Sequence, residues 1–166
     1  MHMYNKKDQE QEEEKTKEQG KIWILVAIDN SDYATSVAEE AAKVAFEKKA
    51  NVVFLSVVPI PSFVASEGEV DSEYLSEEEE EFQKLHNTLI DSYFKPNSGI
   101  LVESKILHGD PADKIVKYAD QIDAELIVMG NKGRGKLASM LLGSVSEHVA
   151  HHSTRSVLIV KKKNQK

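Results

Sequence analysis

Residues 22–28 read Ile22-Trp23-Ile24-Leu25-Val26-Ala27-Ile28, an unbroken apolar run that ends at the polar triplet Asp29-Asn30-Ser31. The run is too short for an ordinary helix, and it lacks the alternation expected of a strand with one solvated face. Continuous hydrophobicity of this kind is typical of a strand that is buried on both faces, as in a parallel sheet. The run therefore predicts a strand with helices packed on both sides of it.

Further strands and helices are predicted to alternate along the chain. Four strands are expected at residues 52–58, 100–107, 124–129 and 156–160. The expected helices are one that Ser31 can cap, a charged one at residues 72–95, one that starts at Asp110-Pro111, and a short one from Ser144. The inward positions of the charged helix are Leu75, Phe82, Leu85, Leu89 and Tyr93. Strands that alternate with helices build a doubly wound parallel α/β sheet with right-handed crossovers.

The position of a ligand follows from this fold. In a doubly wound sheet, ligands bind beyond the carboxyl ends of the strands, where the winding reverses direction. The loops that follow Ile28 and Met129 both lie at carboxyl ends. They share one crevice if the first and fourth strands are neighbours.

Composition limits the classes of protein that the chain can represent. Its 166 residues fit one domain, which we place at residues 21–162, between a flexible acidic extension at 1–20 and a basic tail at 163–166. The absence of cysteine excludes disulfides and thiolate chemistry. No apolar run approaches the roughly 20 residues that cross a bilayer, and the polar N-terminus is unlike a signal peptide. We therefore expect a cytoplasmic protein with no membrane partner.

Charge is distributed unevenly along the chain. The net charge is -7, yet residues 130–166 hold eight Lys or Arg and a single Glu. A nucleic-acid-binding protein usually carries a basic domain or a broad basic stripe. A short basic segment on an acidic protein suits a small anion better, so we expect no nucleic-acid partner.

The basic segment begins with a glycine-rich loop at residues 130–143. Gly130 and Gly133 permit main-chain conformations that are closed to other residues, and successive amides in such a turn can form a concave anion site. Gly143 precedes the last helix, whose first N–H groups favour negative charge, and Ser144 with Glu147 matches a capping box. Two anion sites in one loop suit a polyphosphate, although the glycines can also be ordinary turn and cap residues.

Two familiar phosphate-binding motifs nearly match this loop. Gly130-x4-Gly135-Lys136 resembles a P-loop, but Leu137 stands where a hydroxyl would hold magnesium. Gly133-x-Gly135-x2-Ala138 resembles a dinucleotide-binding fingerprint, but only one predicted strand follows it and the required acidic residue is missing. We assign neither motif.

The spacing Gly130-x2-Gly133-x9-Gly143-Ser144 resembles the ATP-binding motif of the universal stress protein family. The flanking stretches agree: Val26-Ala27-Ile28-Asp29-Asn30-Ser31, His108-Gly109-Asp110-Pro111-Ala112, Leu142-Gly143-Ser144-Val145-Ser146-Glu147-His148-Val149 and Ser156-Val157-Leu158-Ile159-Val160. The resemblance covers residues 21–162. It implies an adenine nucleotide alpha hydrolase-like fold, with five parallel strands in the order 3-2-1-4-5 and helices on both faces.

The resemblance also implies a ligand and a site. Family members with the intact glycine motif typically bind ATP. The resemblance therefore implies that this chain binds ATP, with or without Mg²⁺. The implied binding residues are Ala27, Asp29, Val57, Met129, Gly130, Gly133, Gly143, Ser144, Val145 and Ser146. Asp29 would bind the ribose or the base, although it could instead cap a helix, and Val57 would contact the adenine. The phosphates would lie on amides and serine hydroxyls of the glycine loop, and we add Lys132, Arg134 and Lys136 as cations near them.

Metal binding and catalysis have less support in the sequence. His148, His151 and His152 have a spacing that can bind a divalent metal. However, histidine also suits the negative end of a helix, and no set of carboxylates accompanies these three, so we expect no metal site. Hydrolysis of ATP needs a base or a water-orienting group, and none is identifiable. We therefore name no catalytic residue and expect slow or absent turnover.

These observations predict an ATP-binding stress-response protein whose nucleotide state is read by partners. The resemblance further implies a homodimer that pairs the last strands of two subunits. Two alternative functions stay open. One is an ATPase or nucleotidyl transferase of the same architecture, and the other is an interaction protein that keeps the glycine loop only for its fold.

Overall fold

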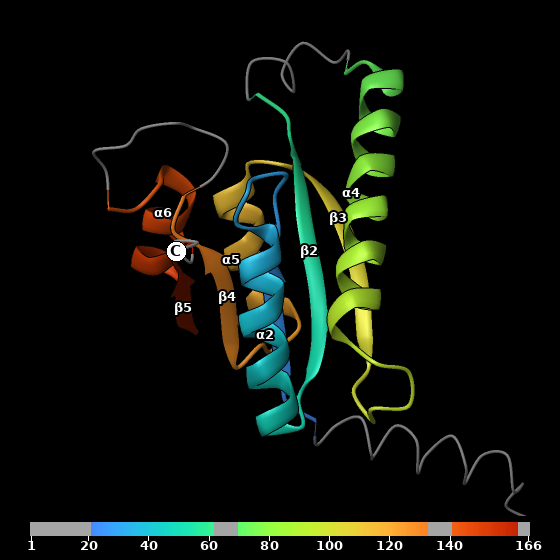
Figure 1. Cartoon of the computed structure of the whole chain (residues 1–166). Coiled ribbons are helices and arrows are strands. Elements are labelled where there is room, and N and C mark those ends of the chain that lie inside the picture. The colour runs from blue at the N-terminus through green and yellow to red at the C-terminus, as the bar shows by residue number, and fades with distance from the viewer. Residues whose placement is uncertain (1–20, 62–69, 133–140, 163–166) are drawn as a thin grey trace, which may run out of the picture.

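The computed structural model of the chain describes residues 21–61, 70–132 and 141–162 (Figure 1). Its strands are β1 (Trp23–Ala27), β2 (Asn51–Pro59), β3 (Val102–Gly109), β4 (Leu126–Gly130) and β5 (Ser156–Val160). Its helices, which alternate with these strands, are α2 (Ala34–Lys48), α4 (Ser72–Tyr93), α5 (Pro111–Gln121) and α6 (Ser144–His152). The elements form one five-stranded sheet with helices around it, which confirms the predicted fold class.

The sheet has the strand order β3-β2-β1-β4-β5, and all of its pairings are parallel. The central strand β1 pairs with β2 on one side and with β4 on the other, where Ala27 lies opposite Met129. The first and fourth strands are therefore neighbours, as the shared-crevice prediction requires. The chain winds outward in opposite directions from this pair, so the direction reverses between β1 and β4.

Two helices cover each face of the sheet. Helices α2 and α4 pack over a core that includes Ile24, Val26, Phe54 and Val128, and α5 and α6 pack over the other face. Successive side chains of a strand point to opposite faces, so both sides of β1 and β2 must be apolar to be buried. Burial of both faces of β1 therefore explains why the apolar run at residues 22–28 is unbroken.

Some predicted element boundaries and caps are wrong. Helix α5 begins as predicted, because the Asp110 carboxylate accepts a hydrogen bond from the Asp113 N–H (2.8 Å). Helix α2 has no side-chain cap, since its N-cap residue is Tyr33 and Ser31 lies in the preceding turn. Strand β3 lies two residues later than predicted, because its partner β2 continues to Pro59, which pairs with Gly109.

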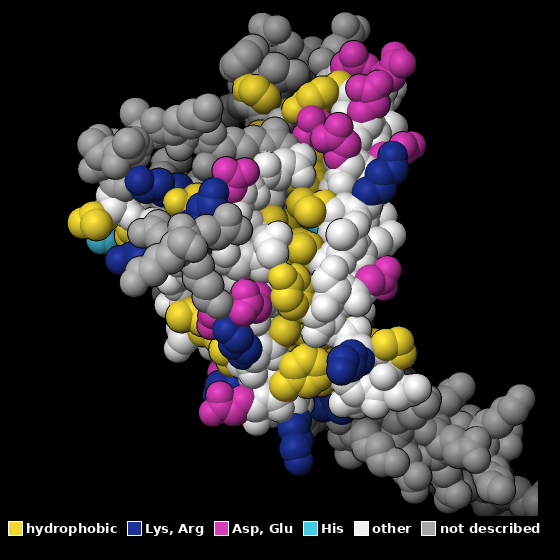
Figure 2. Space-filling view, viewed as in Figure 1, with side chains coloured by type: hydrophobic (Ala, Val, Ile, Leu, Met, Phe, Trp, Pro, Cys, Tyr) yellow, Lys and Arg dark blue, Asp and Glu magenta, His cyan; other side chains and the backbone are white. Residues whose placement is uncertain are grey.

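The charged helix α4 has a solvated outer face and a buried inner face. Figure 2 shows acidic side chains gathered over the end of α4 at which the helix begins. On the inner face, Phe82 and Leu89 are buried as predicted. His86 is also buried, at 0% exposure, which the sequence did not indicate. No helix in the described ranges is both long and apolar enough to cross a bilayer.

Candidate functional site

A cavity of about 440 Å³ lies where the carboxyl ends of β1, β2 and β4 meet the first turns of α2, α5 and α6. Small-molecule pockets in proteins typically enclose roughly 300–1,000 Å³. The cavity opens at the β1/β4 boundary, where the winding of the sheet reverses. Its size and position therefore suit a small-molecule ligand.

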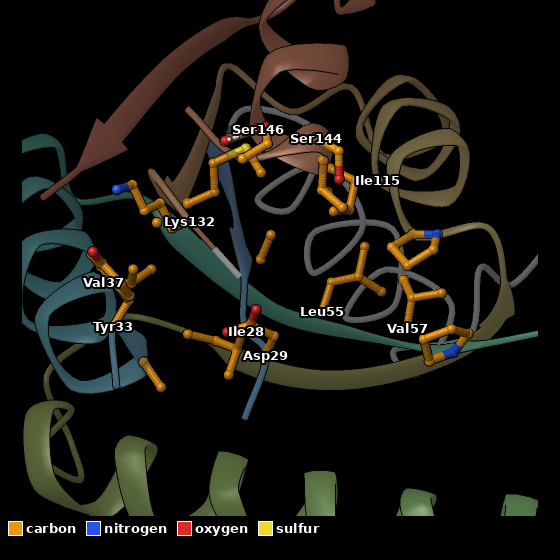
Figure 3. Close-up of a pocket in the computed structure, with 18 of the residues that line it drawn as sticks. Ile28, Asp29, Tyr33, Val37, Leu55, Val57, Ile115, Lys132, Ser144 and Ser146 are labelled. Atoms are coloured by element: carbon orange, nitrogen blue, oxygen red, sulfur yellow. Dashed lines mark hydrogen bonds between the residues drawn. The ribbon is translucent and has the colours of Figure 1, made fainter. Parts of the chain in front are cut away.

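Nine of the ten predicted binding residues line this one cavity (Figure 3). They are Ala27, Asp29, Val57, Met129, Gly130, Gly143, Ser144, Val145 and Ser146. Lys132, predicted as a nearby cation, also lines it. Gly133, Arg134 and Lys136 lie outside the described residues.

One side of the cavity is apolar. Val57 of β2 and Ile115 of α5 lie together on this side, away from Tyr33 and Lys132 (Figure 3). The apolar lining of the cavity also includes Pro59, Phe82 and Pro111, none of which was predicted as a site residue. A flat apolar ring is the kind of group that such a wall accepts.

A helix start faces the same cavity. The Glu147 N–H donates to the Gly143 carbonyl (2.9 Å), which is the first hydrogen bond of α6. The N–H groups of Ser144, Val145 and Ser146 therefore have no partner within the helix. These three residues line the cavity, and a helix start of this kind attracts anions.

The predicted capping box at this helix start is wrong. The N-cap residue is Gly143, no side chain caps the helix, and Ser144 is its first residue. The Ser146 hydroxyl instead donates to the carbonyls of Asn131 (2.9 Å) and Gly143 (3.0 Å), and Ser146 is only 2% exposed. The proton of this hydroxyl is therefore directed to main-chain carbonyls, so Ser146 would bind a ligand through its N–H group.

Asn131 holds the two ends of the glycine-rich loop together. Its N–H donates to the Val160 carbonyl (3.0 Å), and its own carbonyl accepts the Gly143 N–H (2.7 Å). Its side-chain amide donates to the Leu141 carbonyl (3.3 Å). Asn131 was not predicted as a site residue, because its only signal in the sequence is an amide side chain directly after the first glycine of the motif.

Gly130 is needed for space rather than for an unusual main-chain conformation. Among the described glycines, the left-handed region is occupied by Gly99 and Gly109, so the conformation predicted for Gly130 is wrong. A Cβ atom at Gly130 would lie 3.1 Å from the Cβ atom of Tyr33, closer than side chains normally pack. Tyr33, which was not predicted as a site residue, lines the cavity beside Lys132.

Asp29 lies in the cavity lining but does not cap α2, whose N-cap residue is Tyr33. One oxygen of its carboxylate accepts a hydrogen bond from the Ser31 N–H (3.1 Å), which organises the turn before α2. The residue also lines the cavity, where Asp29 and Lys132 are the charged residues among those described. The cavity therefore offers an acceptor at the end of β1 and a cation at the end of β4.

The histidines of α6 form a local pair away from this lining. The rings of His148 and His152 stack with centroids 4.1 Å apart, and His152 Nδ1 lies 2.9 Å from the His148 carbonyl oxygen. Within the described ranges, no three His, Cys, Asp or Glu side chains group closely enough to hold a metal ion.

Comparison with known proteins finds relatives over most of the chain. The model of the Universal stress protein family matches residues 23–161. Universal stress protein MJ0531 of Methanocaldococcus jannaschii is 36% identical over 143 residues, which cover 84% of this chain and 81% of that protein.

Solved structures of universal stress proteins are also similar. One is a complex with cAMP, with a TM-score of 0.65 and 27% identity, and the match covers 84% of this chain and 96% of that one. Another, from Archaeoglobus fulgidus, is a complex with dAMP, with a TM-score of 0.62 and 26% identity, covering 84% and 98%. Together with the fold and the glycine spacing, these matches show that the chain belongs to the universal stress protein family.

Proposed function

We propose that the chain binds ATP in this cavity and acts as a nucleotide-dependent regulatory protein in a stress response. The observation that carries the proposal is the division of one cavity into an apolar wall around Val57 and the amides of residues 144–146, which have no partner within α6. ATP has the same division, because its flat base is largely apolar and its phosphates are anionic.

Each part of the nucleotide has candidate partners in the cavity. The base would lie against Val57 and Ile115, and the Asp29 carboxylate would accept a hydrogen bond from the ribose or the base. The phosphates would lie at the start of α6, where N–H groups and the helix dipole favour negative charge. Lys132 would add a cation near them, and Gly133 would complete the loop motif.

The relatives support the adenine part of this ligand. One solved universal stress protein holds cAMP and another holds dAMP, and both molecules are adenine nucleotides. The triphosphate rests on the glycine spacing, which resembles the ATP-binding motif, and on the start of α6.

We further propose that bound ATP is held rather than rapidly hydrolysed. Hydrolysis needs a group that orients water, together with cations on the transferred phosphate. Among the described lining residues, Asp29 is the carboxylate, and one of its oxygens already accepts the Ser31 N–H. We also propose that the protein is cytoplasmic, where ATP is abundant. We propose in addition that it forms a homodimer paired through β5.

The decisive experiment identifies the bound nucleotide and then removes its site. Mass spectrometry of gently purified protein should detect ATP or AMP, and calorimetry should detect ATP binding to protein from which nucleotide has been removed. Gly130→Val with Gly143→Ala should abolish binding and leave the circular dichroism spectrum unchanged. The valine would crowd Tyr33, and the new methyl group at residue 143 would narrow the approach to the amides of α6.

Ala150→Val is the matched control, because it adds volume at an exposed position of α6. It should bind ATP like the wild type. A wild-type protein that shows no heat of binding with any adenine nucleotide would refute the proposed function, and it would favour the alternative of a non-nucleotide interaction protein. Turnover with magnesium at roughly 1–100 per second would instead favour an enzyme.

A further inference from the structure

A buried histidine lies directly behind the wall of the cavity. The ring of His86 is held between two serine hydroxyls, with Nε2 2.7 Å from Ser56 Oγ and Nδ1 2.7 Å from Ser104 Oγ. The Ser56 hydroxyl also donates to the main-chain carbonyl of Ile28 (2.7 Å). A continuous chain of hydrogen bonds therefore runs from α4 through β2 to the residue that follows β1.

The positions of the protons follow from the partners. A carbonyl oxygen can only accept, so the single proton of the Ser56 hydroxyl points to Ile28. Ser56 Oγ must then accept from His86, which places a proton on Nε2. In the neutral ring, Nδ1 accepts from the Ser104 hydroxyl (2.7 Å), for which the Gln83 Oε1 atom, at 3.4 Å, is the more distant acceptor. Every polar atom of the imidazole thus has a partner of the right kind.

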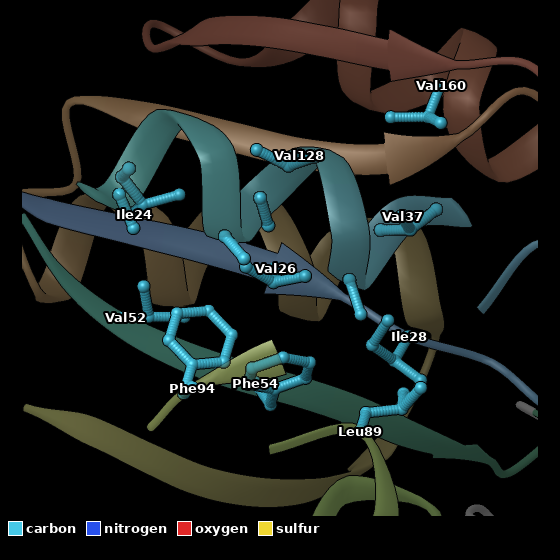
Figure 4. Close-up of a cluster of buried hydrophobic side chains, with 14 of the residues drawn as sticks. Ile24, Val26, Ile28, Val37, Val52, Phe54, Leu89, Phe94, Val128 and Val160 are labelled. Atoms are coloured by element: carbon cyan, nitrogen blue, oxygen red, sulfur yellow. The ribbon is translucent and has the colours of Figure 1, made fainter. Parts of the chain in front are cut away.

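The Ile28 carbonyl controls where Asp29 lies. The Ile28 N–H donates to the Leu55 carbonyl (2.9 Å), and its carbonyl accepts from Ser56, so both polar groups of this residue are held by β2. Its side chain belongs to the same core cluster as Leu89 of α4 (Figure 4). The next residue is Asp29, which lines the cavity. A rotation of the peptide group between Ile28 and Asp29 would move the Asp29 carboxylate.

A serine beside a histidine can also be a nucleophile with its base. That role does not fit here, because Ser56 is 1% exposed and is not among the residues that line the cavity. Its proton is directed to a carbonyl of the main chain. Ser56 and His86 therefore act as a structural pair that holds the end of β1 in place.

We infer that His86 is a positioning residue of the cavity, which acts through the Ser56 hydroxyl to hold the Ile28 carbonyl and thereby Asp29. This inference rests on the proposed function for its link to nucleotide affinity. Without a donor at Nε2, the Ser56 Oγ atom loses the hydrogen bond that helps to fix its side-chain position, which should weaken its hold on the Ile28 carbonyl. Helix α4 thus contributes to the site twice, through Phe82 in the lining and through His86 behind it.

Two pairs of variants test this role. The terminal nitrogen of glutamine occupies the place of histidine Nε2, and that of asparagine the place of Nδ1. His86→Gln therefore keeps a donor for Ser56, whereas His86→Asn loses it. Ser56→Ala removes the hydroxyl that contacts Ile28, whereas Ser104→Ala removes the hydroxyl on the opposite side of the same ring.

Two measurements apply to all four variants. Calorimetry gives the dissociation constant for ATP, and the amide chemical shift of Asp29 in nucleotide-free protein reports the peptide group directly. His86→Asn and Ser56→Ala should bind ATP about five-fold more weakly, the size expected when one hydrogen bond is lost, and should shift the Asp29 amide. His86→Gln and Ser104→Ala should retain wild-type affinity and the wild-type Asp29 shift.

Equal effects of Ser56→Ala and Ser104→Ala on both measurements would overturn the inference, as would wild-type behaviour of His86→Asn. If the His86 variants do not fold, the comparison of Ser56→Ala with Ser104→Ala alone tests the inference. A wild-type protein that does not bind ATP defeats the proposed function, and the Asp29 shift still tests the positioning role.

Discussion

His86 couples the stability of the protein to pH. Burial lowers the pKa of its imidazole from the ordinary value of 6.5 to about 4. The unfolded chain binds a proton there as the pH falls through 6.5, whereas the folded protein binds it only near pH 4, so the unfolded state holds more protons between these values. The contribution of His86 to the free energy of unfolding should therefore fall by about 3 kcal/mol as the pH is lowered from 6.5 to 4. Urea titrations across this range measure the loss.

The contribution of His86 is isolated by two variants. His86→Gln has no titratable group at this position, so its free energy of unfolding should fall less steeply over the same pH range. His151→Gln removes an exposed histidine of α6 and should keep the wild-type slope, because His86 is intact. Identical pH dependence in the wild type and in His86→Gln would contradict the assignment.

Individual residues also show which parts of the site could be predicted from the sequence. Residues at or just beyond strand ends, such as Gly130 and Asp29, could be predicted because the fold brings those ends together. The role of His86 could not, because it depends on Ser56, which is 30 residues away in the chain. Asn131 likewise bonds to Val160, a partner that no local pattern indicates.

Among the secondary-structure elements, α6 separates the two serines at its start into different roles. The Ser146 hydroxyl is buried and bonds to two carbonyls, whereas Ser144 is exposed at the cavity. Ser146→Ala should therefore lower the free energy of unfolding by about 1 kcal/mol, because a buried hydrogen bond is lost. Ser144→Ala should leave that free energy unchanged and weaken ATP binding. Chemical denaturation and calorimetry on the same two proteins measure both quantities.

The two variants serve as each other's control, since both remove one hydroxyl from the first turn of the same helix. Equal destabilisation of both would mean that Ser146 does not hold the helix start. Unchanged ATP affinity in Ser144→Ala would remove its hydroxyl from the proposed contacts and leave the main-chain amides to carry the phosphates.

The strands could be predicted more accurately than the helix starts for a physical reason. A strand buried on both faces is encoded by its own apolar residues, as in β1 and β2. The start of α6 depends instead on main-chain bonds from Asn131 to Gly143, which any residue other than proline could donate or accept. The side chains at the start of α6 therefore predicted a capping box that the folded protein does not form.

For the molecule as a whole, the two edges of the sheet differ. Strand β3 carries exposed Glu103 and Lys105, and charges on an edge strand discourage pairing with another chain. Strand β5 presents Val157, Leu158 and Ile159 and has no charged residue. The unprotected edge is therefore the one through which we propose that two copies pair.

Main-chain geometry offers a way to block this pairing without unfolding the subunit. The Val160 carbonyl accepts from Asn131 beyond β4, so alternate residues of β5 face β4, and the N–H groups of Val157 and Ile159 face outward. Val157→Pro removes an outward donor and spares the bonds to β4, so light scattering at micromolar concentration should show a dimer for the wild type and a monomer for the variant. Val102→Pro makes the same change on the outer side of β3 and should stay dimeric. A monomeric wild type, or a dimeric Val157→Pro, would exclude β5 as the interface.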